Sequence, residues 1–365
     1  MGATGVGKST FVNLVSNSNL PVGSGLASCT AELQVSEPFM MDGKIVTLID
    51  TPGFDDAVKT EAEILRLIAD FLAKTYENGR KLSGVIFLHR ISDQRMGGVA
   101  RKNFRLFRKL CGDDALKHII IATTMWGGVS AEIGARREAE LSTKDQFFKL
   151  ALDKGAKLVR HDNTLQSAQN ILREITGYLP QALSIQTELV DEHKDINETA
   201  AGMDLKADLE ARIGKQHMEL NDIKTEMNRL LAVKDEKHRA ELEELTTSLL
   251  EVRQQLAAAE DERSKLHEKH DVSQKEQEEK TMQLMAAMEK KERQLRELQS
   301  RVSQQTQAIE ALQASLASAE EKVKQGRKEL EAVIVDRSGP KRPPMLLQVA
   351  SIGAVLLWAI VRGRH

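Results

Sequence analysis

The chain has 365 residues, of which 41% are hydrophobic, but it contains only thirteen aromatic residues. Twelve of these precede position 179 and the thirteenth is Trp358, while no proline lies between Pro180 and Pro340. Globular cores normally use aromatic residues and their turns use proline, so a single globular domain spanning the whole chain is excluded. The composition instead predicts a globular domain over 1–180, a helical segment over 181–339 and a short, distinct tail.

Charge changes at the same boundary. Residues 1–178 hold 23 basic and 20 acidic side chains, whereas residues 181–339 hold 25 basic and 34 acidic ones. The overall net charge is −2, so nothing in the chain predicts nucleic-acid binding. The two cysteines, Cys29 and Cys111, do not provide a disulfide framework, and a reducing compartment is therefore predicted.

The first residues match a phosphate-binding loop. Residues 2–9 read GATGVGKS, which is the pattern G-x-x-x-x-G-K-[ST]. Backbone N–H groups of the glycine-rich turn are expected to surround phosphate oxygens at the start of a helix over 10–15. Lys8 is expected to reach the β- and γ-phosphates, and the Ser9 hydroxyl to ligate Mg²⁺. The predicted nucleotide-contacting residues of this loop are Gly2, Gly5, Val6, Gly7, Lys8, Ser9 and Thr10.

A second phosphate motif follows 42 residues later. Residues 45–49 read as a buried strand and end in the D-x-x-G sequence that runs from Asp50 to Gly53. In P-loop GTPases this Asp holds a Mg²⁺-bound water, and the Gly amide senses the γ-phosphate. Thr30, between the two motifs, is predicted to complete the Mg²⁺ shell, with an ordinary loop threonine as the alternative. Ser9, Thr30 and Asp50 are the predicted metal-site residues.

Strand and helix patterns alternate along the rest of the first domain. A hairpin is expected across the Asp42-Gly43 turn. Further strands are expected over 82–88 and 118–124, and helices over 61–76, 101–110, 141–152 and 164–178. This alternation predicts an α/β fold, the three-layer sandwich of P-loop NTPases, with a mostly parallel sheet and helices on both faces.

The expected first strand of this fold is missing from the pattern. A phosphate loop follows a strand, but only Met1 precedes Gly2. The first strand is therefore expected to be truncated, and its two neighbours in the sheet to lack a hydrogen-bonding partner. A chain that begins at Met1 is expected to fold poorly.

These motifs carry a resemblance to a known family. GATGVGKST, Thr30 and DTPGFDD together resemble the AIG1/IMAP-type G domains of the septin-like P-loop GTPases. The likeness is closest to the fungal members, in which a phrase like residues 89–98 follows the fourth strand. The resemblance covers 1 to about 178. It implies binding of GTP or GDP with Mg²⁺, and dimerisation that can involve the G domain itself.

The sequence departs from this family where the guanine base is normally read. The usual N/T-K-x-D motif after the fifth strand is absent, and residues 123–127 read TTMWG. Thr124 is a candidate for a remaining polar contact. Trp126 is a candidate for stacking on the base, with core packing as an equal alternative. Asp162, after the last strand, is a candidate replacement for the missing acceptor. GTP therefore follows from the resemblance alone, and an ATP-preferring NTPase is a weaker alternative.

Candidate catalytic residues are few. Phe54 follows Gly53 at the position where a Ras-like enzyme carries its water-orienting Gln, so slow hydrolysis is predicted. Arg90 and Arg95 are candidates for stabilising the transition state, either in cis or across a dimer. The alternative for both arginines is surface ion pairing in a loop.

Apolar residues repeat in heptads over the last part of 181–339. Ten of twelve core positions are apolar over six heptads, which predicts a coiled coil that dimerises the chain. Two shorter apolar phases, over 220–230 and 242–259, are separated by register breaks near 231–241 and 270–281. The a positions are Leu295, Val302, Ile309, Leu316, Val323 and Leu330, and the d positions are Leu298, Gln305, Leu312, Ala319, Gly326 and Val333.

The tail has the features of a membrane anchor. Residues 345–361 form a run of seventeen residues without a charge, flanked by basic residues, and Trp358 lies near its far end. Seventeen residues is the lower limit for a spanning helix, and an aromatic residue near the interface is typical. A C-terminal transmembrane tail anchor is predicted, with packing of an apolar helix in a soluble protein as the alternative. The mitochondrial outer membrane, the peroxisome and the endoplasmic reticulum are all compatible membranes.

These features together predict a GTP-binding protein that faces the cytosol from an organelle membrane. We expect a slow GTPase switch that dimerises through its coiled coil. The alternative is a structural membrane tether whose nucleotide domain is degenerate.

Overall fold

The computed structural model describes residues 1–22, 32–56, 59–233, 239–267 and 271–337. The chain divides into two compact units, one over 1–296 and one beginning at Glu297. Thr30 and the predicted membrane anchor over 345–361 lie outside the described residues. Among the residues that are described, no helix is both long enough and apolar enough to cross a membrane.

A parallel sheet lies at the centre of the first unit. It is formed by β5 (Val85–Arg90), β6 (Ile119–Thr124) and β7 (Lys157–Arg160), in that order. All six residues of β6 are buried. Its sequence, IIIATT, is rich in the β-branched residues that suit a strand covered on both faces. This confirms the predicted mostly parallel sheet.

Helices cover both faces of this sheet. Phe87 and Ile121 belong to one hydrophobic core with α2 and α3, whereas Leu88 and Ile120 belong to a second core with α1 and α6. The alternation follows from the two-residue period of a strand. The covering helices are α1 (Lys8–Ser16), α2 (Glu61–Glu77), α3 (Gly98–Cys111) and α6 (Leu165–Thr176). The three-layer α/β arrangement of a P-loop fold is thus observed.

One predicted helix is displaced. In place of a helix over 141–152, the chain forms α4 (Ala131–Thr143) and the short α5 (Lys149–Leu152). The start of α4 was readable from the sequence, because Ser130 caps it by accepting a hydrogen bond from the amide of Ile133.

The predicted hairpin is present. β2 (Phe39–Met41) pairs with β3 (Lys44–Val46) across Asp42 and Gly43, whose φ angles of 49° and 78° suit a tight type I′ turn. β1 (Gln34–Val35) pairs in the antiparallel sense with β4 (Ile49–Asp50).

The sheet is interrupted between β4 and β5. Among the described residues β4 pairs only with β1, and the open edge of β5 meets only Met1 and Gly2. The Met1 carbonyl accepts from the Leu88 amide at 2.9 Å, and the Met1 α-amine donates to the Ile86 carbonyl at 2.7 Å. A cavity of about 370 Å³ occupies the gap. The two strands predicted to lack a partner are the ones that border it.

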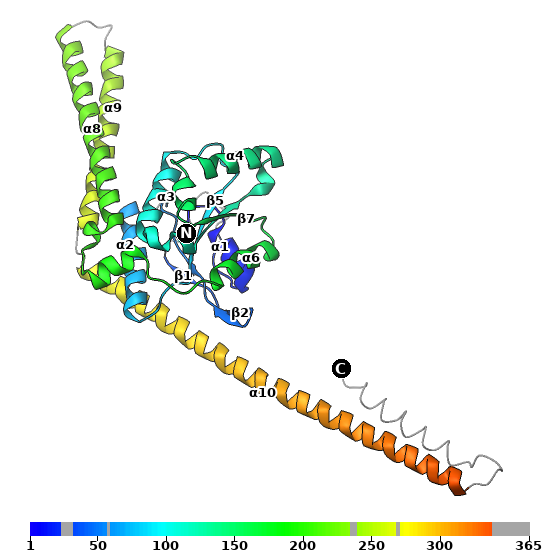
Figure 1. The fold of residues 1–365 in the computed structure, drawn as a ribbon. Helices are drawn as coiled ribbons and strands as arrows, with labels where there is room; N and C mark the ends of the chain where they lie inside the picture. The colour runs from blue at the N-terminus through cyan, green and yellow to red at the C-terminus, as the bar shows by residue number, and fades with distance from the viewer. Residues whose placement is uncertain (23–31, 57–58, 234–238, 268–270, 338–365) are drawn as a thin grey trace. The chain divides into compact units, whose positions relative to one another are not determined.

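A helical hairpin completes the first unit. α8 (Ala200–Val233) and α9 (Arg239–His267) run side by side and pack against α3 and α2 (Figure 1). Leu205, Leu209 and Leu266 are buried in the same core as helices α2 and α3. Each such leucine stabilises the packing by about 1.5–3 kcal/mol. Composition placed a boundary at 180, but the core continues past it with leucine and alanine in place of aromatic rings.

The two shorter apolar phases pair with each other inside the chain. Leu220 of α8 and Val252 and Ala259 of α9 are buried. The first predicted register break coincides with the interval between Val233 and Arg239, where α8 ends and α9 begins. The described residues 200–233 and 239–267 therefore form two helices that pack against each other within one chain.

Short helical turns connect this hairpin to the α/β domain. They are α7 (Ser184–Gln186), a π-helical turn (Thr187–Asp191) and a 3-10 turn (Ile196–Glu198). The buried amide of Gln186 donates to the Leu72 carbonyl at 2.8 Å, which ties the connection to α2.

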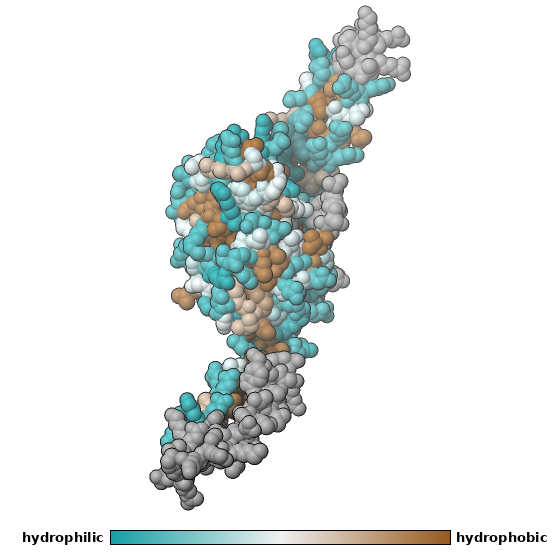
Figure 2. All heavy atoms as spheres, turned by 90° about the vertical axis from the view of Figure 1, so that its right-hand side faces the viewer, coloured by the Kyte–Doolittle hydropathy of each residue, from teal (hydrophilic) through white to brown (hydrophobic). Residues whose placement is uncertain are grey.

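The last described helix, α10 (Asp271–Arg337), enters both units. Its first part is packed in the first unit, where Met285 and Met288 are buried. In the second unit its apolar heptad positions are exposed: Leu298, Val302, Ile309, Leu312, Leu316 and Val323 are each 54–72% accessible. By contrast, the face of the molecule in Figure 2 is mostly hydrophilic, with hydrophobic residues in scattered patches. The apolar heptad residues predicted from the sequence are thus exposed along α10.

Candidate nucleotide-binding site

The phosphate loop has the conformation that its glycines predict. Gly2, Gly5 and Gly7 have φ angles of 137°, 74° and 95°, which L-residues with side chains rarely adopt. A Cβ on Gly2 would lie 2.4 Å from the Leu88 carbonyl oxygen. The loop leads directly into α1, with Gly7 at the N-cap position. The N-terminal N–H groups of α1 are therefore placed where an anion is bound in such loops.

Lys8 points its ammonium group back at this loop. Its Nζ donates to the carbonyl oxygens of Gly2 at 3.1 Å and Ala3 at 2.8 Å. Burial lowers the pKa of Lys8, while neighbouring carboxylates, led by Asp50, oppose the shift. Phosphate oxygens are strong acceptors for the same ammonium hydrogens.

The two predicted metal-site residues that are described lie together. Ser9 Oγ donates to Asp50 Oδ2 at 2.5 Å, and Asp50 is buried at the end of β4. A hydroxyl and a carboxylate beside a phosphate loop fit Mg²⁺, which takes oxygen ligands and keeps several waters. His161 does not belong to such a site, because its ring bonds Ser167 and packs edge-on against Phe11.

The D-x-x-G turn packs directly on the phosphate loop. A Cβ on Gly53 would lie 2.5 Å from Thr4 Oγ1 and 2.6 Å from the Thr4 nitrogen. That nitrogen donates to Asp55 Oδ1 at 2.5 Å. The buried hydroxyls of Thr4 and Thr51 have no hydrogen-bond partner within the part of the chain that the structure describes. Two unpaired hydroxyls at the junction of both phosphate motifs fit an oxygen-rich ligand.

The loop after β6 is tied to the phosphate loop through its backbone. Thr124 Oγ1 donates to the Val6 carbonyl at 3.0 Å, with the His89 carbonyl at 3.4 Å. Thr124 is buried, and because its hydroxyl bonds the Val6 carbonyl, the side chain positions the phosphate loop. The next residue, Met125, is exposed, and its Cε lies 3.8 Å from where a Cβ on Gly7 would be.

Residues 1–122 match the family model described as 50S ribosome-binding GTPase. The N-terminal region is a P-loop GTPase G domain. GTP-binding protein A of Dictyostelium discoideum is 27% identical over 128 residues, which are 34% of this chain and 26% of that protein. The chain thus spans about a quarter of this relative's length.

Two solved structures resemble the fold more distantly, both at 18% identity. One comes from work on dimerisation of the chloroplast translocon components atToc33 and psToc159; it has a TM-score of 0.39 and covers 48% of this chain and 80% of that chain. The other is from an oligomerised bacterial dynamin pair, with a TM-score of 0.28, covering 72% of this chain and 46% of that chain. At these TM-scores neither likeness supports an argument about function.

Trp126 packs within the G domain. Its indole N–H donates to the Thr123 carbonyl at 3.0 Å, and the guanidinium of Arg160 lies 4.4 Å from the ring centre. A Cβ on Gly134 would come within 2.6 Å of the ring. Of the two alternatives for this residue, the geometry therefore favours packing. Gly127 follows with open space where its side chain would be.

Asp162 has a local structural role. Its Oδ1 accepts from the Thr164 nitrogen at 3.1 Å and the Thr164 hydroxyl at 2.6 Å. Hydrogen bonds from Ser167 and Thr164 lower the pKa of Asp162 to about 2. The side chain organises the turn before α6, a role that its position two residues before a helix-capping threonine could have indicated.

Only one of the two candidate arginines reaches the phosphate loop. Arg90 ends β5, and its Nη1 lies 3.5 Å from where a Cβ on Gly5 would be. Its Nε is 3.1 Å from Asp93 Oδ1. Arg95 is exposed in the following turn. Phe54, at the usual position of a water-orienting Gln, is only 1% accessible.

Proposed function

We propose that this protein is a GTP-binding switch that hydrolyses GTP slowly, dimerises through α10 and is anchored to an organelle membrane by residues 345–361. The observation that carries the proposal is the junction of the two phosphate motifs. Ser9 meets Asp50, and Gly53 packs against Thr4, in the arrangement that a Mg²⁺-bound triphosphate requires.

Each residue of this junction would make a different contact with the nucleotide or its metal ion. The N–H groups at the start of α1 and the Lys8 ammonium would hold the phosphates. Ser9 would ligate Mg²⁺ and Asp50 one of its waters; the ion supplies charge neutralisation between the β- and γ-phosphates. Gly53 packs against Thr4 of the loop, so a change at the γ-phosphate would reach the chain after Gly53.

Slow hydrolysis follows from the side chains near the γ-phosphate position. Phe54 is buried and apolar and cannot orient water. Arg90 is the candidate that the fold brings to the loop in cis, where a guanidinium would stabilise the developing charge. A G domain with this arginine and without the usual Gln is expected to turn over slowly.

Dimerisation is supported by the exposed stripe of α10. Its six apolar side chains are spaced as a and d positions of a heptad. Such a stripe is stabilised when a second helix covers it. A second copy of this chain presents the same stripe and is the proposed occupant.

The nucleotide proposal is tested by titrating the full chain with fluorescent GTP, GDP and ATP. Lys8→Ala should weaken binding by about 10–100-fold, because one charge-assisted contact is worth roughly 1.5–3 kcal/mol. The matched control is Lys109→Ala on the exposed face of α3, which should bind as the unchanged chain does. No binding of any nucleotide would instead favour a structural tether with a degenerate nucleotide domain.

The dimer and the anchor need separate experiments. Leu312→Asn with Leu316→Asn should convert a dimer to a monomer in analytical ultracentrifugation, whereas Gln313→Asn with Ala317→Asn, off the stripe, should not. A monomeric starting protein would contradict the proposal. For the anchor, removal of residues 345–361 should release the chain from membranes during carbonate extraction. The supporting feature is the uncharged run of seventeen residues.

A further inference from the structure

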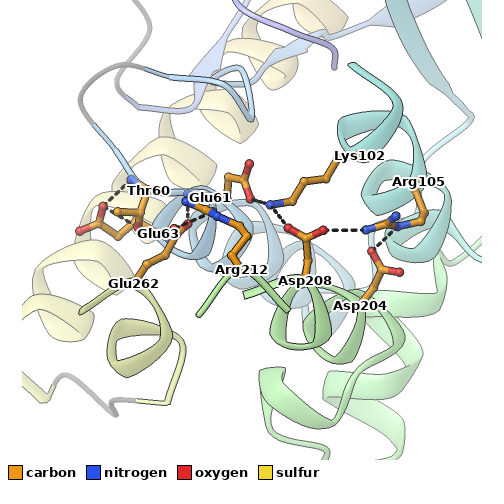
Figure 3. Close-up of polar contacts among 9 residues, drawn as sticks. All are labelled: Thr60, Glu61, Glu63, Lys102, Arg105, Asp204, Asp208, Arg212 and Glu262. Carbon is orange, nitrogen blue, oxygen red and sulfur yellow. Dashed lines mark hydrogen bonds and ion pairs between the residues drawn. The ribbon is translucent and has the colours of Figure 1, made fainter. Parts of the chain in front are cut away.

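The helical hairpin holds the start of the helix that follows the second phosphate motif. We call this helix, α2, the switch helix. Glu262 of α9 accepts a hydrogen bond from the backbone nitrogen of Glu61 at 3.0 Å (Figure 3). The other oxygen of Glu262 accepts from Arg212 of α8 at 3.4 Å, and Glu262 is only 7% accessible. A carboxylate at this end of a helix is stabilised by its unpaired N–H groups.

The switch helix in turn caps α9. Arg66 donates to the carbonyl oxygens of Lys265 at 3.3 Å and Leu266 at 3.1 Å, in the last turn of α9. Glu63, already part of the Thr60 capping box, pairs with the Lys265 ammonium at 3.4 Å. The Arg66 guanidinium is a cation at the carboxyl end of α9, where a positive charge stabilises a helix. Each of the two helices therefore caps one end of the other.

A second set of ion pairs joins α8 to the adjacent helix α3. Lys102 bridges Glu61 and Asp208, the latter at 2.6 Å, and Arg105 pairs with Asp204 at 2.8 Å (Figure 3). Burial raises the pKa of Glu61 despite this pairing. Burial alone would also raise the pKa of Asp208, but Lys102 and Arg105 together lower it. Separating the helices would break these ion pairs, which are partly shielded from water in the packed state.

Two behaviours of the hairpin are conceivable when the nucleotide changes: it detaches as a latch, or it moves with the switch helix as a lever. Burial of Leu205, Leu209 and Leu266 favours the docked state by about 10³-fold or more. Coupling between a ligand and a conformational change is typically a factor of roughly 5–150. A nucleotide is therefore too weak an effector to detach the hairpin.

We infer that the α8–α9 hairpin is a lever arm fixed to the switch helix, so that nucleotide-dependent displacement of α2 swings the hairpin tip. This inference rests on the proposed nucleotide switch. Glu262 and Arg66 are the positioning residues of the lever, because they join the two helix ends across which the displacement passes. The hairpin is then the output of the G domain toward whatever its tip contacts.

The lever is tested with pairs of spin labels on the full chain and pulsed electron resonance distances. One pair, Ala73→Cys with Ser264→Cys, reports the contact between α2 and α9. The other, Glu132→Cys with Glu244→Cys, reports the hairpin tip against α4. Cys29→Ser removes one native thiol from the background, and Cys111 is buried. Between GDP and a non-hydrolysable GTP analogue, the first distance should stay constant and the second should shift.

Variants separate coupling from folding. Glu262→Leu should shrink the nucleotide-dependent shift of the tip while nucleotide affinity stays within about threefold. Arg66→Met, at a less buried site, should act in the same direction if the first variant unfolds. Glu226→Leu, an exposed ion-pair residue of α8, is the control and should leave the shift unchanged.

The outcomes are distinguishable. Separation of Ala73 from Ser264 in either nucleotide state would show a latch and overturn the lever. A tip that stays in place while titration shows nucleotide binding would overturn it as well. Absence of nucleotide binding would instead remove the proposed function beneath it.

Discussion

The hydroxyl of Thr124 donates to the carbonyl of Val6 at 3.0 Å, which ties the loop after β6 to the phosphate loop. This bond holds the base-side loop in register with the phosphates although the residues that usually read guanine are missing. The loop after β6 thus lies beside the phosphate loop, but it lacks the Lys and the Asp of the N/T-K-x-D motif. Gly127 now stands where the resemblance to N/T-K-x-D places the base-reading carboxylate.

The first prediction concerns base selectivity. The unchanged protein should prefer GTP over ATP by less than about tenfold, because Gly127 provides no carboxylate to accept the guanine N–H groups. Gly127→Asp should raise the preference by roughly 10–100-fold, as expected for a charged hydrogen bond. A Cβ at Gly127 meets no atom within 4 Å, so the variant fits. Competition titrations measure the ratio.

The control for this prediction is Gly214→Asp, another open glycine, which lies on α8. It should leave the GTP to ATP ratio unchanged. A strong GTP preference in the unchanged protein would mean that another group reads the base, and Asp162 would then be the residue to replace.

The second prediction distinguishes the two arginines. Arg90→Ala should lower kcat for GTP hydrolysis by about 10²–10³-fold with little change in affinity, because its guanidinium lies beside Gly5. Arg95→Ala, exposed in the next turn, should have a much smaller effect. Single-turnover kinetics with separate binding measurements check both. A larger loss for Arg95 would indicate that the arginine acts across a dimer.

Local signals carried most of what could be predicted. The phosphate loop, the Asp42-Gly43 turn and the parallel strand β6 each depend on a few consecutive residues, and each was found. The capping box of Thr60 and Glu63 is equally local. The hydrogen bond from the Glu61 nitrogen to Glu262 joins residues 201 positions apart, and no short sequence pattern predicts it.

The core of the first unit extends past the compositional change near 180 for a related reason. Aromatic residues and prolines become absent near 180, but a core can continue with aliphatic residues, as Ile196, Leu205 and Leu266 show. The register break between Leu230 and Leu242 was visible in the sequence. It did not reveal that the two phases on either side of it pair with each other.

The third prediction concerns acid stability. Burial lowers the pKa of His89 to about 4, with Asp93 opposing and Arg90 adding to the shift. Since the unfolded chain has a His pKa near 6.5, it binds more protons between pH 6.5 and 4. Stability should therefore fall as pH decreases through this window, by up to about 3 kcal/mol.

His89→Leu should flatten this part of the pH profile of the free energy of unfolding, measured by urea denaturation. The exposed His217→Gln is the matched control and should keep the slope. An unchanged slope in His89→Leu would mean that other groups cause the acid sensitivity.

The fourth prediction tests the gap between β4 and β5. Met1 and Gly2 already lie parallel to Leu88 at its edge, and the cavity beyond them is lined by apolar residues such as Ile49 and Ile86. A five-residue extension ahead of Met1, made of valine and isoleucine, should enter this gap as a strand. With about four new backbone hydrogen bonds it should stabilise the fold by roughly 2–6 kcal/mol.

The extension also removes a buried ionisable amine. Burial, reinforced by Lys8, lowers the pKa of the Met1 α-amine to about 5 from its ordinary value of 8.0. The unfolded chain therefore binds more protons between pH 8 and 5, and the unextended protein should lose stability as pH falls through that range. An extension of glycine and serine converts the same amine to an amide but fills no cavity. The glycine–serine extension should remove only the pH dependence of stability between pH 8 and 5. An equal increase in the free energy of unfolding from both extensions would show that the gap does not accept a strand.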